Sequence, residues 1–115
     1  MPRLRRLLCA LALTAALPSC VSEDDLRREW SGYVETVDEC TDAADCTLVS
    51  PGCPLGCYDA VRAESLADAT AEADRLVGTY EGTGRTCEYD CPEAPRVLCA
   101  AGRCCLEGQC DPAME

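Results

Sequence analysis

The chain has 115 residues with 21 acidic and 10 basic side chains, and its formal charge of −11 argues against nucleic acid as a partner, because phosphate would repel it. It contains no His and no Lys, so a nucleophile with an imidazole base or a Schiff-base lysine cannot be built, and we expect no enzyme, no catalytic residues and no cofactor. Large apolar side chains are scarce, with no Phe and one Trp, so the domain needs covalent cross-links, which twelve cysteines can supply.

Residues 1–19 have the pattern of an export signal, with three arginines ahead of an apolar run from 7 to 17. That run is shorter than the about 20 residues that cross a bilayer, which favours a cleaved signal over a permanent transmembrane helix. The Leu-Pro-Ser-Cys that follows resembles the lipobox of bacterial lipoproteins, so Cys20 is predicted to carry the lipid, palmitate included, as the mature N-terminus. Plain secretion is the alternative. Val21 follows the lipid cysteine where Asp would signal inner-membrane retention, which favours the outer membrane.

The segment 20–38 is predicted to hold the lipid-attachment cysteine and an N-terminal helix. Ser22 followed by three acidic residues is typical of a helix start, and apolar residues then recur at helical spacing, so we expect a helix over 23–37. A strand over 30–37 is the alternative. After cleavage, seven arginines and 21 acidic residues remain, a formal charge of −14, and no flexible spacer separates the lipid from the folded part.

Residues 39–115 are predicted to form one disulfide-rich domain. Its first part, up to residue 58, is dense in Asp, Gly, Pro and Cys, which indicates a loop, with a short strand over 47–49. Four acids between Asp38 and Asp45 could supply oxygen ligands to calcium, or could form Asx turns that shape the loop.

A long central helix is predicted over 59–77, with Asp59 as its N-cap and with Gly78 or Gly82 at its end. The side chains expected on its buried face are Leu66, Ala69, Ala73, Leu76, Val77 and Tyr80.

The last elements are two β-prone runs, 96–100 and 103–107, which flank Ala101-Gly102 and predict a hairpin with a tight turn. We therefore expect a small disulfide-rich α+β fold. In it the N-terminal helix precedes one long central helix, which packs on a two- or three-stranded antiparallel sheet, with 47–49 as the third strand.

Ten cysteines remain when the signal and the lipid-bearing Cys20 are set aside, and an even number in an exported chain predicts five disulfides. They are Cys40, Cys46, Cys53, Cys57, Cys87, Cys91, Cys99, Cys104, Cys105 and Cys110. The two C-x3-C pairs could instead offer four thiolates to zinc, but the oxidising compartment favours disulfides, and we predict no metal. The neighbours Cys104 and Cys105 should have different partners, because successive side chains of a strand leave opposite faces.

Reach restricts the pairing. A helix over 59–77 would be about 28 Å long, and the chain from its end to Cys87 spans at most about 33 Å when fully extended. Cys57, at the helix start, is therefore not expected to pair with Cys87. We expect Cys87 near the helix C-terminus, with Cys40 as a candidate partner. Cys53 and Cys57 are free to meet the hairpin, because the chain from Gly78 to Cys99 is long enough to return.

The cysteine spacing from Cys40-x5-Cys46 through Cys87-x3-Cys91 to the hairpin resembles that of small Cys-rich lipoproteins of unknown function from GC-rich bacteria such as myxobacteria. The resemblance covers residues 40–105 and implies an envelope location but no activity. The adjacent Cys104-Cys105 is also similar to a feature of whey acidic and knottin inhibitors, whose folds lack a long central helix. The C-x3-C pairs are similar to those of mitochondrial twin C-x3-C proteins, which carry no such signal.

We therefore expect a non-enzymatic cell-envelope lipoprotein with a structural or binding role. Its predicted partners are the membrane, through the lipid, and another envelope protein. The alternative is an inhibitor of extracytoplasmic proteases that presents a disulfide-clamped loop. Candidate loops are 82–87, with Arg85 as the specificity residue, and 53–57, with Leu55 in that role.

Overall fold

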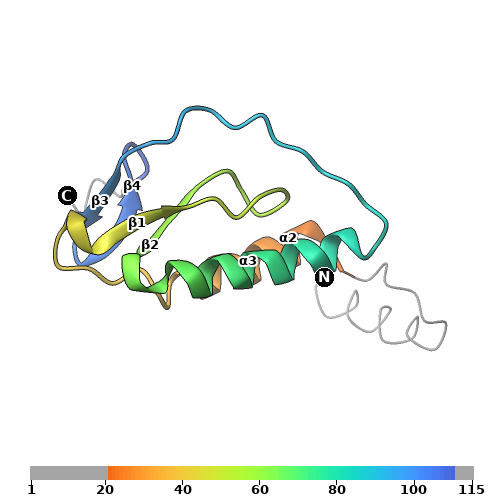
Figure 1. Cartoon of the computed structure of the whole chain (residues 1–115), viewed down its shortest axis with the longest axis horizontal. Coiled ribbons are helices and arrows are strands. Elements are labelled where there is room, and N and C mark those ends of the chain that lie inside the picture. The colour runs from red at the N-terminus through yellow and green to blue at the C-terminus, as the bar shows by residue number, and fades with distance from the viewer. Residues whose placement is uncertain (1–20, 111–115) are drawn as a thin grey trace.

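Two helices lie side by side along one edge of the molecule in the computed structural model, which describes residues 21–110 (Figure 1). They are α2 (Glu23–Val34) and α3 (Leu66–Glu81), and two small antiparallel sheets complete a small disulfide-rich α+β fold. The predicted signal peptide and Cys20 lie outside the described residues. Within residues 21–110, no helix combines the length and apolar character that a membrane span requires.

Helix α2 begins where its sequence predicts. The Ser22 side chain accepts a hydrogen bond from the Asp25 amide at 3.1 Å, and three acidic residues in the first turn suit the positive end of the helix dipole. Leu26 and Trp30, four residues apart, are buried on one face. The helix prediction over 23–37 is therefore confirmed against the strand alternative, with the helical part ending at Val34.

The start of the central helix differs from the prediction. Asp59 is not an N-cap, because Asp59–Arg62 form strand β2, which pairs antiparallel with β1 (Cys46–Val49). A single 3-10 turn, η4 (Ala63–Ser65), then leads into α3. The helix ends at Gly82, the C-cap, and passes through Gly78.

The buried face of α3 consists of Ala69, Ala73, Leu76 and Tyr80 as predicted, whereas Leu66 is exposed and Val77 is half-buried. Leu66, the first residue of α3, is the predicted core position that stays exposed, because the chain has just left β2 at that point.

The second sheet is the predicted hairpin, β3 (Val97–Ala100) and β4 (Arg103–Leu106). Both turn residues have positive φ, 51° at Ala101 and 79° at Gly102, which is the backbone that a two-residue hairpin turn requires.

The expected third strand of this sheet, 47–49, belongs to the other sheet, because its backbone groups pair with β2. The hairpin instead receives an isolated bridge between Glu39 and Arg103. It is made by the Cys104 amide, which donates to the Asp38 carbonyl at 2.6 Å, and by the Cys40 amide, which donates to Gly102 at 2.9 Å.

Two clusters of buried side chains fill the fold. The larger lies between the helices and the first sheet and contains Leu26, Trp30, Val49, Leu55, Val61, Ala69, Ala73, Leu76 and Tyr80. The smaller lies on the hairpin side and contains Ala60, Cys104 and Leu106. The hairpin side therefore has little apolar area to bury.

A polar contact joins α2 to the first sheet inside the larger cluster. The side chain of Trp30 is 1% exposed, and its indole N–H donates to the Asp59 carboxylate at 2.6 Å. The Asp59 side chain lies half-buried at this point, and burial raises its pKa above the ordinary carboxyl value, with the indole hydrogen bond acting in the opposite direction.

This raised pKa predicts a pH-dependent effect of Asp59→Asn. The folded state binds the Asp59 proton more tightly than the unfolded chain does, so the resulting stability is fully present below a pH of about 3.9 and is lost as pH rises through the folded pKa. Asparagine keeps an acceptor for the indole and has no charge to desolvate. The variant should therefore be more stable than the wild type at neutral pH, and the difference should shrink on acidification.

Urea-unfolding midpoints of both proteins between about pH 7 and about pH 4 test this expectation. The difference between the two proteins isolates Asp59, because the other carboxyl groups are common to both. An advantage of the variant that stays constant over this range would contradict it.

Candidate functional site

Ten cysteines form five disulfides. The pairs are Cys40–Cys99, Cys46–Cys104, Cys53–Cys87, Cys57–Cys91 and Cys105–Cys110. Cys104 and Cys105 have different partners, as their alternation along β4 predicts.

Part of the predicted pairing is wrong. Cys87 pairs with Cys53 and not with Cys40, and neither Cys53 nor Cys57 reaches the hairpin. The expectation that Cys57 does not pair with Cys87 holds, although its premise of a helix beginning at Asp59 does not. Strand β2 separates Cys57 from the helix, so the loop before β2 can project back along α3, and a Cβ added at Gly52 would lie 4.0 Å from Val77 in the last turns of that helix.

The acidic segment from Asp38 to Asp45 forms turns that shape a loop. Asp42 accepts from the Ala44 amide at 2.8 Å, and Asp45 accepts from the Thr41 amide at 2.8 Å, so both carboxylates cap a short 3-10 turn, η3 (Ala43–Asp45). Hydrogen bonds from the Thr41 and Asp42 amides lower the pKa of Asp45. Within residues 21–110, no three carboxylates of this segment lie close enough together to share one ion. The contacts therefore support the Asx turns and not the calcium hypothesis.

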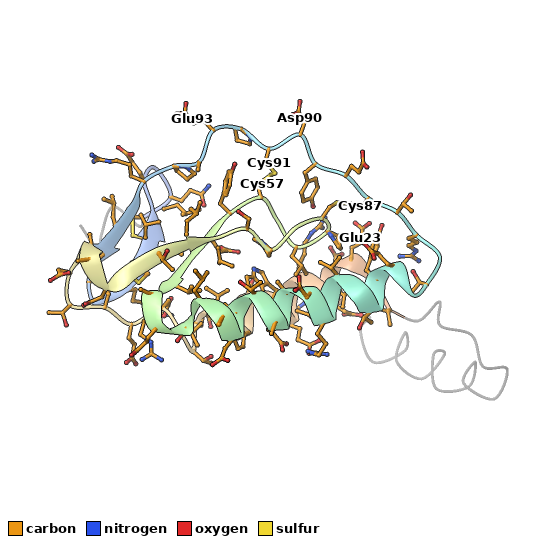
Figure 2. All side chains as sticks on the ribbon, in the orientation of Figure 1. Glu23, Cys57, Cys87, Asp90, Cys91 and Glu93 are labelled. Atoms are coloured by element: carbon orange, nitrogen blue, oxygen red, sulfur yellow. A yellow bond between two sulfur atoms is a disulfide. The ribbon has the colours of Figure 1, made fainter. Side chains whose placement is uncertain are left out.

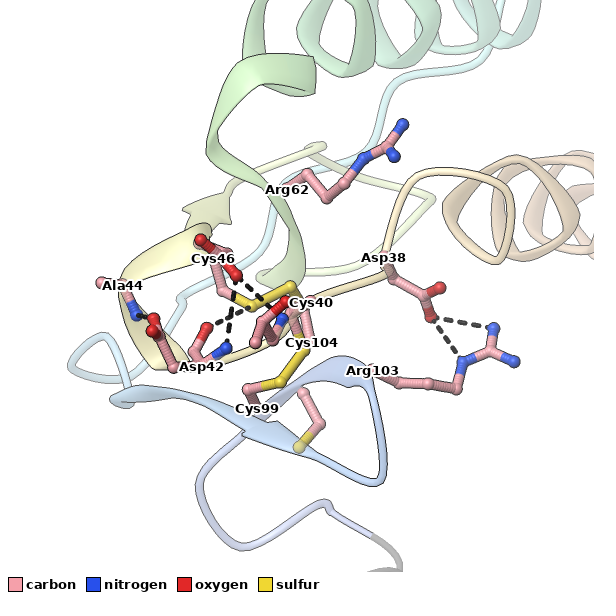
Figure 3. The surroundings of a disulfide bond; sticks show 12 residues. Asp38, Cys40, Asp42, Ala44, Cys46, Arg62, Cys99, Arg103 and Cys104 are labelled. Atoms are coloured by element: carbon pink, nitrogen blue, oxygen red, sulfur yellow. Dashed lines mark hydrogen bonds and ion pairs between the residues drawn. A yellow bond between two sulfur atoms is a disulfide. The ribbon is translucent and has the colours of Figure 1, made fainter.

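Asp38 is directed away from these turns. Its Oδ2 atom accepts from two guanidinium nitrogens of Arg103, at 2.9 and 3.1 Å (Figure 3). Asp38 is buried, so this pair attaches the segment after α2 to the hairpin together with the backbone bridge. The disulfides Cys40–Cys99 and Cys46–Cys104 lie beside this ion pair (Figure 3). The sulfurs of Cys40, Cys46 and Cys104 are within 4.8 Å of one another.

A long segment without helix or strand arches over the opposite side of the molecule. We call residues 84–96 the strap, which runs from the end of α3 to β3, and residues 50–58 the loop, which lies between the strap and the helices (Figure 1). Two disulfides join strap and loop, and Figure 2 shows Cys57 and Cys91 meeting beneath the arch.

Two tyrosines tie strap and loop reciprocally. Tyr58 of the loop donates its hydroxyl to the Pro92 carbonyl at 2.6 Å, and Tyr89 of the strap donates to the Pro54 carbonyl at 3.1 Å. Arg27 of α2 also donates to the Pro54 carbonyl, at 2.8 Å. One loop carbonyl therefore connects helix, loop and strap, and the two disulfides and two tyrosine contacts, together called the brace, hold the strap in place.

A hollow of about 400 Å³ lies between loop and strap. Both brace disulfides, Tyr58, Tyr89 and Glu88 contribute to its lining. The two tyrosines carry no predicted role, although Tyr58 directly follows Cys57 and Tyr89 stands between Cys87 and Cys91. An aromatic residue next to a cysteine, or between two cysteines, is the sequence signal that could have indicated a tyrosine contact beside these disulfides.

The two predicted inhibitor loops differ in accessibility. Leu55 is 8% exposed in the larger cluster, so the loop 53–57 cannot present it, and that part of the prediction is wrong. Arg85 is exposed at the start of the strap. The part of the strap fixed at both ends is Cys87 to Cys91, whose cysteines form the predicted disulfides but which is not one of the predicted inhibitor loops.

The long-range disulfides should contribute more stability than the local one. Cys46–Cys104 spans 58 residues and Cys105–Cys110 spans five. Loop-closure entropy predicts about 4 kcal/mol for the first and about 2 kcal/mol for the second. Cys46→Ala/Cys104→Ala should thus lower the free energy of urea unfolding by about 2 kcal/mol more than Cys105→Ala/Cys110→Ala. Equal losses in the two double variants would contradict this ranking.

The chemistry available on the strap is that of carboxylates, tyrosine rings, disulfides and backbone amides. Glu88, Asp90 and Glu93 are exposed, and Figure 2 shows Asp90 and Glu93 directed away from the body of the molecule. Such groups can bind a partner by charge and hydrogen bonding. No family model, curated protein or solved structure matches this chain.

Proposed function

We propose that this chain is a non-enzymatic lipoprotein of the cell envelope, anchored by lipid on Cys20, whose acidic domain binds another envelope component. The observation that carries the binding role is the strap, which is exposed to solvent and yet held by two disulfides and two tyrosine hydrogen bonds. A segment fixed in this way loses little conformational entropy when it binds.

The envelope location rests on cysteine chemistry and on the leader. Five disulfides fit an extracytoplasmic compartment. The ten cysteines from Cys40 to Cys110 pair among themselves, so none of them takes Cys20 as a partner, which supports its use for lipid. Helix α2 begins three residues after Cys20, so the lipid would hold the domain close to the membrane surface, and Val21 favours the outer membrane.

A second candidate function is inhibition of extracytoplasmic proteases. It is favoured by the same strap, because an exposed segment between two disulfides can lie in a protease cleft without first being ordered. In this reading the segment from Cys87 to Cys91, or Arg85 before it, would contact the protease.

Lipid anchoring predicts that Cys20→Ser releases the protein from the membrane. The full chain, expressed with its leader in a Gram-negative host, should partition into the detergent phase, and its N-terminal peptide should begin at Cys20 and carry acyl mass. Cys9→Ser is the matched control, because it removes a cysteine of the signal outside the lipobox and should leave partitioning unchanged. A mature N-terminus other than Cys20 without added lipid would contradict the anchor.

The inhibitor candidate predicts that the purified, oxidised domain slows at least one protease in a panel of extracytoplasmic serine proteases of different specificity. If Arg85 is the specificity residue, Arg85→Ala should abolish inhibition of a trypsin-like member, whereas Arg96→Ala should not. A domain that slows no protease, or that is degraded as fast as its reduced form, would remove this candidate and leave the anchor untouched.

A further inference from the structure

Side chains of the strap tie it to the loop at alternate positions. Cys87, Tyr89 and Cys91 contact the loop, through Cys53, the Pro54 carbonyl and Cys57 in turn. Among the described residues, Glu88 and Asp90, which stand between them, form no disulfide or hydrogen bond with the loop. All four residues from Glu88 to Cys91 are exposed, and Glu88 also borders the hollow. This period of two is that of an extended strand, in which successive side chains leave opposite faces.

The backbone of this strand-like segment has no strand beside it. Among the described residues, no backbone-to-backbone hydrogen bond involves residues 85–95, and the Pro92 carbonyl accepts only from the Tyr58 side chain. The amide and carbonyl groups from Glu88 to Cys91 are therefore open to a partner. Pro92 lacks an amide hydrogen, so ladder pairing would end there.

An open strand edge of this kind is a template for another extended segment. An extended segment outside a sheet usually needs ordering before it binds. The brace already fixes this one at both ends. Hydrogen bonds to the backbone can then be gained without the loss of entropy that a free loop would incur.

The charge of the strap selects the partner. Glu88, Asp90 and Glu93 make no ion pair within the described residues, and no basic residue occurs between Arg85 and Arg96. Glu88 and Asp90 are two residues apart, so they would face cationic side chains at the same spacing on a paired strand.

We propose that the strap is a strand-pairing site for a basic protein segment that carries Arg or Lys at alternate positions. The inference rests on the proposed binding role of this domain and names the surface and the chemistry of the partner. Backbone hydrogen bonds along Glu88–Cys91 supply the alignment, and the two carboxylates select the cationic residues.

The test uses blocked peptides and the oxidised domain. The probe is Arg-Thr-Arg-Thr-Arg, and its control of equal charge and composition is Arg-Arg-Arg-Thr-Thr. A third peptide has the probe sequence with alternate amides N-methylated, which removes hydrogen-bond donors and keeps the charge. We expect the probe to bind at least about tenfold more tightly than either control, and to slow amide hydrogen exchange in the strap.

Matched protein variants separate strap charge from net charge. Glu88→Gln/Asp90→Asn should weaken binding of the probe at least about tenfold. The control Glu35→Gln/Asp74→Asn removes the same two charges from exposed positions outside the strap that form no ion pair within the described residues. It should change binding by less than about twofold.

Equal binding of the N-methylated peptide, equal binding of the block peptide, equal effects of the two double variants, or no binding of the probe would each overturn the strand-pairing site. Detergent partitioning of the full chain is measured separately. Failure of the strap proposal is thus distinguishable from failure of the lipid anchor.

Discussion

The covalent attachment of the C-terminal hairpin to the segment after α2 is the constraint on which the rest of the fold depends. Cys40–Cys99 and Cys46–Cys104 close loops of 59 and 58 residues. The buried cluster on this side has one leucine, one alanine and one cysteine. Burial of one leucine is worth about 1.5–3 kcal/mol, less than the about 4 kcal/mol that each long loop closure contributes. Leu48, Tyr58 and Val97 add half-buried packing around this cluster, and the two long-range disulfides supplement this small core.

On the helix side, a single aromatic residue performs the equivalent task. Trp30 is enclosed by the larger cluster, and its indole N–H finds an acceptor in Asp59 at the start of β2. A buried indole without an acceptor would lose a hydrogen bond that it makes in water. This contact fixes β2 against α2, and it thereby directs the loop before β2 toward the last turns of α3.

The position of the loop in turn determines the position of the strap. Both disulfides of the brace link strap and loop at the same offset along the chain, 34 residues, so the two segments run side by side over Cys53–Cys57 and Cys87–Cys91. Each of these ties uses at least one side chain, so no backbone-to-backbone hydrogen bond joins the strap to the loop. The same arrangement therefore holds the strap in place and leaves its backbone groups free of backbone partners, as the proposed strand pairing requires.

Elements with local signals could be predicted from the amino-acid sequence alone. The serine cap and apolar spacing specify α2, the apolar face from Ala69 to Tyr80 specifies most of α3, and Ala101-Gly102 specifies the hairpin turn. The even number of cysteines predicted disulfides as a class, because that inference depends on composition and compartment and not on geometry.

The role of Asp59, the partners of the cysteines and the identity of the strap depend on contacts between segments that are distant in sequence. An aspartate before an apolar run favours a helix cap by its local preference. Here pairing with β1 and the contact with Trp30 override that preference. Cysteine pairing depends on where the loop reverses the chain between β1 and β2, and no local spacing of cysteines encodes that position. The strap forms no helix or strand, and its conformation follows from the loop to which it is bound.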